Sequence, residues 1–236
     1  MQRSFFIWNG VDSRTMGLLL EGRAPIVRPE ERVVHVQIPG KSGDMTETEG
    51  QAIYNSYIQT VSFSVVGKER VNAMLKWLRG PGYVTFSAEP DRRQSARVIG
   101  AITMDRVPMS LDSWKGQAQF YCQPLKERLY SIAETLTAAG TVRNAGDVDA
   151  FPVIIATPAL GATDMAVTVN GKTLTINYVS GPVRIDSEAQ EVSDEARTAL
   201  LTQETGGPFP VLHAGDNTVG GSGWASLAIY KNERFL

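Results

Sequence analysis

The stretch that decides the fold is residues 61–100, VSFSVVGKERVNAMLKWLRGPGYVTFSAEPDRRQSARVIG. Its first residues alternate apolar and polar side chains, with Val61, Phe63 and Val65 separated by serines. A period of two is typical of a strand with one buried face and one solvated face. The stretch therefore begins with a predicted strand that covers a core.

A helix is predicted directly after this strand, over residues 68–79. Its apolar side chains recur on one face, while lysine and arginine occupy most of the remaining positions. Gly80-Pro81-Gly82 ends the helix, because glycine accepts a left-handed cap and proline cannot continue the hydrogen-bond ladder. Residues 83–88 are extended again, and another strand begins near Val98. One helix inside a run of strands predicts a mainly β fold of the α+β type.

A long segment without an apolar run interrupts the strands of the N-terminal half. Residues 33–38 and 58–66 are predicted strands, and PGKSGDMTETEGQAIYNSY (Pro39–Tyr57) joins them. A connection of this length is uncommon in a compact domain and usually has a function or is disordered. We expect an extended arm or a long hairpin tip at residues 39–57, with an ordinary surface loop as the alternative.

The C-terminal half contains short strands separated by turn signals. Val167 and Val169 precede Asn170-Gly171, the dipeptide favoured in two-residue type I′ hairpins. Regularly spaced short strands predict a β-sandwich. Glu195–Leu201 could form a short helix, although its apolar face is weak.

A domain boundary is predicted near the middle of the chain. Residues 129–150 lose the alternation and become rich in small and polar residues. We expect residues 1–128 to form an N-terminal β-sandwich with one helix and the arm, and residues 129–236 to form a second β-sandwich.

Composition excludes several classes of protein. The chain has 236 residues and a formal net charge of −2, which does not suit a protein that wraps nucleic acid electrostatically. Cys122 is the single cysteine, so no internal disulfide can form, and we expect it to pack in the core. Phe5–Trp8 is too short an apolar run for a secretion signal, and no membrane insertion is expected.

The sequence offers no convincing catalytic, metal or cofactor site. His35 and His213 lie in different predicted domains and lack zinc-ligand neighbours. Gly40-Lys41-Ser42 lacks the preceding glycine and following helix of a phosphate-binding loop. Glu89 and Asp91 flank a proline in a turn, where carboxylates usually pair with nearby arginines such as Arg92. We therefore expect no enzyme activity and no cofactor.

Two other motifs fail on spacing. Asp44, Glu47 and Glu49 form a carboxylate cluster, but residues at the third, fifth, sixth and twelfth positions do not fit a calcium-binding EF-hand loop. Gly221-Ser222-Gly223 lacks the third glycine of a dinucleotide-binding turn and leads into a strand.

The order of several motifs resembles the distal tail protein family of long-tailed bacteriophages and prophages. The motifs span most of the chain. They are RSFFIWNGVDSRTMGLLLEG (3–22), ERVVHVQIPGKSGDMTE (31–47), WLRG (77–80) followed by SAEPDRR (87–93), FYCQPLKER (120–128), and then FPVIIAT, VNGKTLTI, VRIDSEAQEV and FPVLHAGDNTVG in the C-terminal half.

This resemblance implies a structural virion protein assembled in the host cytoplasm and located at the tail tip. Members of the family form hexameric rings, often stacked back to back, with a peripheral galectin-like sandwich that resembles carbohydrate modules. The ring joins the tail tube to the host-adsorption apparatus and leaves a channel for DNA. The implied partners are further copies of the chain, the tail tube protein, the tape-measure protein, and the tail-associated or receptor-binding hub proteins.

Candidate contact residues follow from the arm and from the tryptophans. Ile53, Tyr54 and Tyr57 suit buried anchors at a subunit interface, whereas charged arm residues suit its polar rim. The charged residues are Lys41, Asp44, Glu47 and Glu49. Trp114 and Trp224 lie beside glycines and could contact a glycan or a partner, although core packing is the alternative. A carbohydrate-binding module that contributes to host attachment is the second functional hypothesis, and a tail-associated hydrolase is the third.

Overall fold

The structure is a computed structural model that describes residues 4–48, 53–110, 112–201 and 205–236. The chain divides into two compact units, Met1–Leu129 together with Leu236, and Tyr130–Phe235. Each unit has its own hydrophobic core. Independent folding of the two halves stays a prediction.

Unit 1 is built on one antiparallel sheet with the strand order β2-β1-β7-β8-β10-β6-β3, and β9 pairs with β10. Its strands are β1 (Phe6–Trp8), β2 (Val11–Asp12), β3 (Leu19–Leu20), β6 (Tyr57–Val66), β7 (Pro81–Phe86), β8 (Arg92–Ile99), β9 (Met104–Arg106) and β10 (Ser113–Arg128). The sequence predicts a β-sandwich for this half of the chain. In the structure, its strands belong to one continuous sheet. The reason is the length of β10, whose 16 residues pair with β6, β8 and β9.

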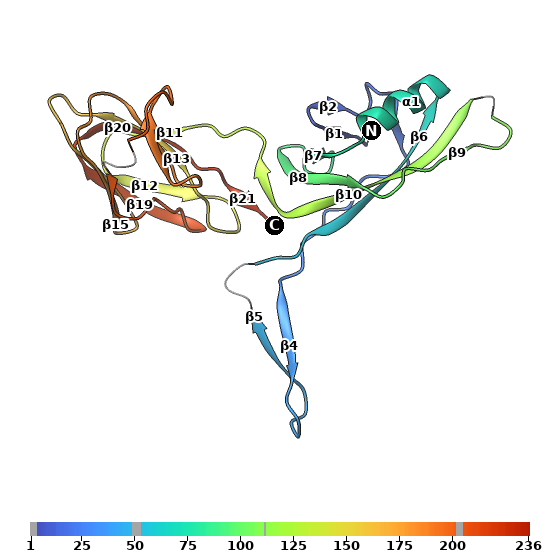
Figure 1. Cartoon of the computed structure of the whole chain (residues 1–236), viewed down its shortest axis with the longest axis horizontal. Coiled ribbons are helices and arrows are strands. Elements are labelled where there is room, and N and C mark those ends of the chain that lie inside the picture. Colours follow the sequence, from blue (N-terminus) through green and yellow to red (C-terminus); the bar gives the residue numbers. More distant parts are fainter. Residues whose placement is uncertain (1–3, 49–52, 111, 202–204) are drawn as a thin grey trace. The chain divides into compact units, whose positions relative to one another are not determined.

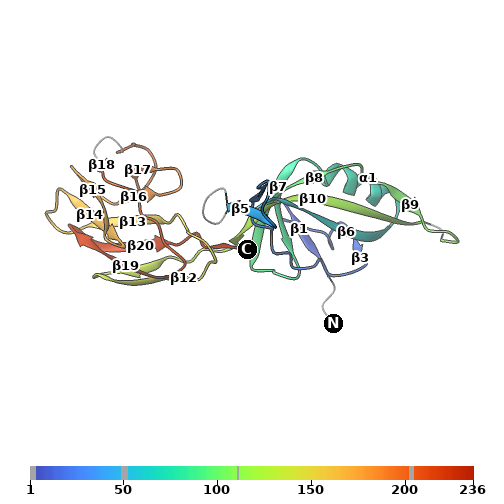
Figure 2. The same cartoon turned by 90° about the horizontal axis from the view of Figure 1, so that it is seen from below.

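The helix α1 (Lys68–Trp77) covers one face of this sheet, as Figure 2 shows. Val61, Phe63 and Val65 of β6 are buried, as their alternation predicts, and the buried α1 residues Val71 and Met74 belong to the same core. α1 ends two residues before the expected Arg79. The fold class predicted for the chain, mainly β with one helix, is confirmed in the part of the chain that the structure describes.

An aromatic cluster forms the centre of this core. The ring of Phe120 lies 5.4 Å from Phe6, 5.4 Å from Trp8 and 5.9 Å from Phe86, measured between centroids. Cys122, two residues further along β10, is fully buried, and its burial raises the pKa of the thiol to about 12. A thiol with so high a pKa is unreactive at neutral pH, in agreement with its expected role in core packing.

The arm is a separate two-stranded antiparallel sheet made of β4 (Val33–Gln37) and β5 (Asp44–Thr48), drawn as its own ribbon in Figure 1. The register runs from Val33 opposite Thr48 to Gln37 opposite Asp44. Residues 33–38, which we expected to flank the arm, therefore supply its first strand. The arm begins earlier than residue 39, because the turn at residues 38–43 folds β5 back onto β4 rather than onto the main sheet.

Unit 2 consists of two five-stranded antiparallel sheets, ordered β11-β20-β13-β16-β17 and β12-β19-β14-β15-β18. Buried side chains from both sheets share one core, so the unit is a β-sandwich. The strands are β11 (Glu134–Leu136), β12 (Gly140–Asn144), β13 (Val153–Pro158), β14 (Met165–Val169), β15 (Lys172–Ile176), β16 (Val183–Asp186), β17 (Glu191–Asp194), β18 (Thr205–Gly206), β19 (Gly215–Ser222) and β20 (Trp224–Tyr230), and β21 (Arg234–Phe235) follows them.

Local turn chemistry explains two features of unit 2. Asn170 and Gly171 adopt φ values of 51° and 79° between β14 and β15, which confirms the predicted two-residue hairpin. The helix considered for Glu195–Leu201 does not form. Instead, the Asp194 carboxylate accepts hydrogen bonds from the amides of Thr198 at 2.6 Å and Ala199 at 2.9 Å, which closes a turn. A short acidic side chain that bonds nearby amides competes with a helix in this way.

No helix in the described part of the chain has the length and hydrophobicity needed to cross a membrane.

Candidate subunit interface

The arm has one apolar face and one polar face. Residues directly opposite each other in an antiparallel pair project their side chains to the same side. Val34 lies opposite Glu47, and Val36 lies opposite Met45, so these four side chains share a face. His35 and Thr46 occupy the other face, where the His35 Nδ1 and the Thr46 hydroxyl lie 3.1 Å apart.

The apolar face of the arm is open to solvent. Val34, Val36 and Met45 are 43%, 42% and 47% exposed, and Ile38 beyond the end of β4 is 39% exposed. A two-stranded hairpin is at best marginally stable in water without something packed on it. The arm therefore presents a surface whose burial requires a partner.

The charged residues predicted for the interface fall on different parts of the arm. Lys41 lies in the exposed turn at the tip, Asp44 begins β5 on the polar face, and Glu47 lies on the apolar face beside Val34. Glu49 lies outside the described residues. The arm thus brings Glu47, but not Asp44, next to the apolar side chains.

The predicted aromatic anchors lie at the base of the arm. Tyr54 is half-buried and forms an isolated bridge with Glu31, while Ile53 is exposed. Tyr57 begins β6, and its hydroxyl donates a hydrogen bond to Gln94 Oε1 at 3.0 Å. Burial raises the pKa of Tyr57 to about 12. Tyr57 therefore stabilises unit 1 itself.

Trp114 and Trp224 are both half-buried at the starts of strands. Trp114 packs against the unit 1 core, and its indole Nε1 donates to Asp112 Oδ1 at 3.0 Å. Trp224 packs against the unit 2 core, and its buried Nε1 has no hydrogen-bond partner among the described residues. Their contact with a glycan or partner stays a prediction, and the observed positions favour the packing alternative.

The residues considered for catalysis have structural partners. Glu89 accepts hydrogen bonds from Arg92 at 2.9 Å and from the buried Lys126 at 2.7 Å. The Asp91 Oδ2 lies 4.0 Å from the Arg92 Nε. The expected pairing of these turn carboxylates with an arginine is therefore present. Within the described ranges, no group of three histidine, cysteine, aspartate or glutamate side chains is arranged to hold a metal ion.

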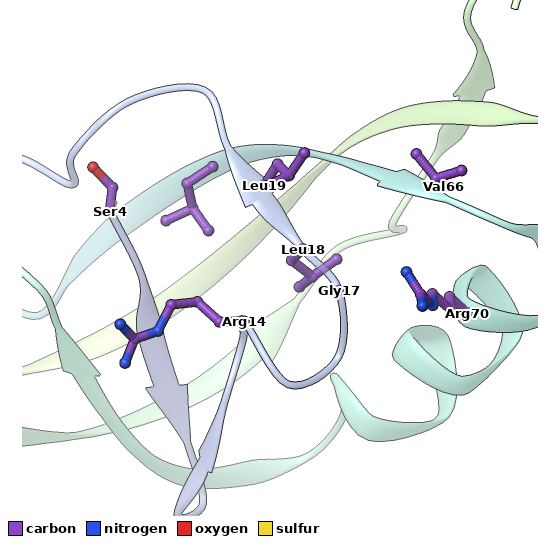
Figure 3. Close-up of a pocket in the computed structure, with 8 residues that line it drawn as sticks. Ser4, Arg14, Gly17, Leu18, Leu19, Val66 and Arg70 are labelled. Carbon is purple, nitrogen blue, oxygen red and sulfur yellow. The ribbon is translucent and has the colours of Figure 1, made fainter. Parts of the chain in front are cut away.

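A pocket of about 570 Å³ lies on unit 1 between the loop after β2, the edge strand β3 and the start of α1 (Figure 3). Leu19 and Val66 contribute exposed apolar side chains to it, and Arg14 and Arg70 contribute charge. Sequence reasoning missed this pocket. Leu19 belongs to a recognisable short strand, but the meeting of the three segments depends on sheet topology, which the sequence pattern did not indicate.

The two arginines of the pocket differ in their partners. Arg14 pairs with Asp12 at 2.5 Å and places its guanidinium 4.1 Å from the Phe5 ring. The hydrogen bonds from Arg14 hold the pKa of Asp12 below its usual value. Arg70 forms no ion pair with any described residue, and Gly17 lies directly against its side chain. Arg70 is thus the cation of this pocket that remains available to a partner.

The fold of the chain is similar to that of a solved phage protein. No family model matches the sequence, and no curated protein is significantly similar to it. Among solved structures, the chain is similar to the crystal structure of the SPP1 Dit (gp 19.1) protein, a paradigm of the hub adsorption apparatus in Gram-positive infecting phages. The two chains are 21% identical, with a TM-score of 0.78 over 100% of each chain. The resemblance to distal tail proteins is therefore confirmed for the fold.

Proposed function

We propose that this protein is a structural component of a phage tail tip, a distal tail ring subunit without enzyme activity. The observation that carries the proposal is the fold shared with SPP1 Dit over the full length of both chains. In the virion, the ring joins the tail tube to the host-adsorption apparatus. It leaves a channel through which DNA passes as cargo.

The partners proposed for the protein follow from this position. The chain binds itself in a hexameric ring, which stacks on a second ring, and it contacts the tail tube, tape-measure and receptor-binding hub proteins. Subunits assemble in the host cytoplasm. A closed ring needs heterologous contacts, in which one surface of each copy meets a different surface of the next.

The arm supplies the first of these surfaces. Its exposed Val34, Val36, Ile38 and Met45 form a continuous apolar row over two strands. Burial of apolar surface stabilises association by about 25 cal/mol per Å² before the costs of ordering are subtracted. The row therefore favours self-association, and the charged Glu47 on the same face affects register more than affinity.

Light scattering across protein concentration tests the proposal. We expect the wild-type protein to form rings, and Val36→Ser with Met45→Ser to remain a folded monomer at the same concentrations. His35→Ser with Thr46→Ser is the matched control on the polar face and should still assemble. A wild type that stays monomeric at all concentrations contradicts the ring, and a ring that tolerates Val36→Ser with Met45→Ser excludes the arm as its interface.

Sugar binding by a galectin-like unit 2 is a second candidate function. One observation favours it: Tyr178 is 81% exposed and adopts a φ of 57°, unusual for an aromatic residue, on the loop after β15. Such a side chain offers a flat face on which a sugar ring can stack. A glycan array probed with the wild type and Tyr178→Ala tests this, and the absence of any signal that Tyr178→Ala removes would exclude it.

A further inference from the structure

We propose that the buried Lys126 is a positioning residue that holds residues 23–30, the strap that leads into the arm, on the sheet of unit 1. The strap lies between β3 and β4 and forms neither helix nor strand. The inference concerns contacts within one chain, so it goes beyond the proposed assembly and does not depend on it.

The strap has little polar attachment of its own. Among the described residues, the backbone of residues 23–29 forms no hydrogen bond with another backbone group. The one hydrogen bond that the described residues offer to this segment comes from a side chain, because Lys126 Nζ donates to the Val27 carbonyl oxygen at 3.4 Å. Ala24 and Pro29 are buried and hold the strap by apolar packing. The ammonium therefore supplies the directional contact that this packing lacks.

Lys126 occupies a position in β10 that is surrounded by the protein interior. It is 5% exposed and lies opposite the buried Gln94 of β8. A buried charge is costly unless it is paired, and Glu89 Oε2 accepts a hydrogen bond from the ammonium at 2.7 Å. The Leu236 carbonyl oxygen, at 3.4 Å, is the third acceptor beside Glu89 and Val27. Three acceptors match the three protons of the ammonium, which fixes its direction toward the strap.

The space around the ammonium is too small for water to take over its role. Pro25 and Val27 of the strap line a hollow of about 20 Å³ together with Glu89 and Lys126. A hollow of this volume has room for about one water molecule. Loss of the ammonium therefore leaves the Val27 carbonyl with little opportunity to find another donor.

The strap passes directly into the root of the arm. The Asn55 amide donates to the Glu30 carbonyl at 2.8 Å, and the Arg32 amide donates to the Ile53 carbonyl at 2.8 Å, so these bonds join the two sides of the root. Val27 lies within about 10 Å of extended chain from Glu30. A strap that is fixed at Val27 therefore gives the arm a fixed starting point on the sheet.

A spin label at position 26 reports the order of the strap in the full-length chain. Ile26 is 65% exposed, so its replacement by cysteine leaves the buried contacts in place. Cys122 is fully buried, and burial raises the pKa of its thiol to about 12, so a maleimide spin label reacts at position 26 alone. The electron paramagnetic resonance spectrum then distinguishes an ordered strap from one that moves on the nanosecond timescale.

Two variants separate the contact with the strap from the ion pair. Lys126→Met keeps the apolar stem but removes the ammonium, and we expect it to mobilise the label. It should also raise the hydrogen-exchange rates of the Arg32 and Asn55 amides about tenfold, because a hydrogen bond from a charged group is lost. Glu89→Gln removes the charge partner but leaves the bond to Val27, so it should lower the urea midpoint without mobilising the label. A general loss of stability would affect the label alike in both variants.

A neighbouring ion pair provides the matched control. Glu127 follows Lys126 in β10 and accepts a hydrogen bond from Arg93 at 3.1 Å, in a pair whose side chains are 41% and 42% exposed. Glu127→Gln should change neither the label spectrum nor the exchange rates. If Lys126→Met does not fold, Lys126→Met with Glu89→Gln takes its place with the same expected mobility, since this variant removes both charges of the pair.

An unchanged spectrum in the Lys126 variant overturns the proposal, because packing alone then holds the strap. Equal mobility in Glu89→Gln overturns it as well, because the effect then comes from general loosening. The measurement is repeated in the Val36→Ser, Met45→Ser background. The same result there supports a contact within one chain whether or not the ring forms, and a label that is mobile in this background even with Lys126 intact overturns it.

Discussion

Replacement of Phe120 by alanine should remove the centre of the unit 1 core. Phe120 is fully buried and makes ring contacts at 5.4–5.9 Å with Phe6, Trp8 and Phe86. A buried Phe→Ala change costs about 3–5 kcal/mol, and aromatic pairs of this geometry contribute about 0.5–1.5 kcal/mol each. Because three such pairs are lost, we expect the free energy of unfolding to fall by about 4–5 kcal/mol.

Urea unfolding of the full chain measures this loss, with the fluorescence of the tryptophans around the cluster as the signal for unit 1. Phe120→Leu should cost only about 1–2 kcal/mol, because most of the apolar volume remains. Tyr121→Ala is the matched control, since the adjacent side chain on β10 is 41% exposed, and it should change stability by about 0.5 kcal/mol or less. A loss below about 1 kcal/mol for Phe120→Ala, or equal losses at both positions, would refute this account of the core.

Three further predictions follow from the described contacts. Leu78→Ala removes a side chain that is 3% exposed at the end of α1, and it should cost about 2–5 kcal/mol in urea unfolding, whereas a loss near 0.5 kcal/mol would place this face outside the core. Residues 1–128 and residues 129–236, expressed separately, should each show protected amides in hydrogen exchange, and a lack of protection in both halves would mean that the boundary is wrong. The pKa of Asp194 lies below its ordinary value of 3.8, mainly because the Ala199 amide donates a hydrogen bond to its carboxylate. The ionised carboxylate therefore contributes to the stability of the folded protein above pH 3.8. This contribution is lost as the pH falls through the lowered pKa of the folded state. Asp194→Asn should flatten that part of the pH profile of thermal unfolding, and an unchanged profile would contradict the assignment.

Local patterns in the sequence predicted the elements that depend on near neighbours. The alternation of Val61, Phe63 and Val65 indicated which face of β6 is buried, and Asn170-Gly171 indicated a hairpin, because side-chain period and positive φ are properties of a few adjacent residues. The same reasoning failed at Asp194, whose side-chain hydrogen bonds outweigh a weak helical pattern.

Long-range pairing explains what the sequence did not indicate. Residues 33–38 have the pattern of a strand, but no local feature shows that this strand pairs with β5 rather than with the main sheet. Glu47 lies in β5 of the arm, and its apolar neighbours Val34 and Met45 emerged only with the register. Arg70 joined a pocket with Leu19 only when the topology placed α1 beside β3.

The central place of β10 has a consequence for how the protein is made. β10 joins β6 at positions separated by 47 residues at one end (66 to 113) and by 65 residues at the other (57 to 122). Sheets that depend on such distant pairs fold slowly, because the loop entropy is lost before the contacts form. At about 5–20 residues per second, the ribosome needs roughly 3–12 s to proceed from Val66 to Arg128. During that time β6 can pair only with the short β3, so its apolar face depends on α1 or on a chaperone for cover.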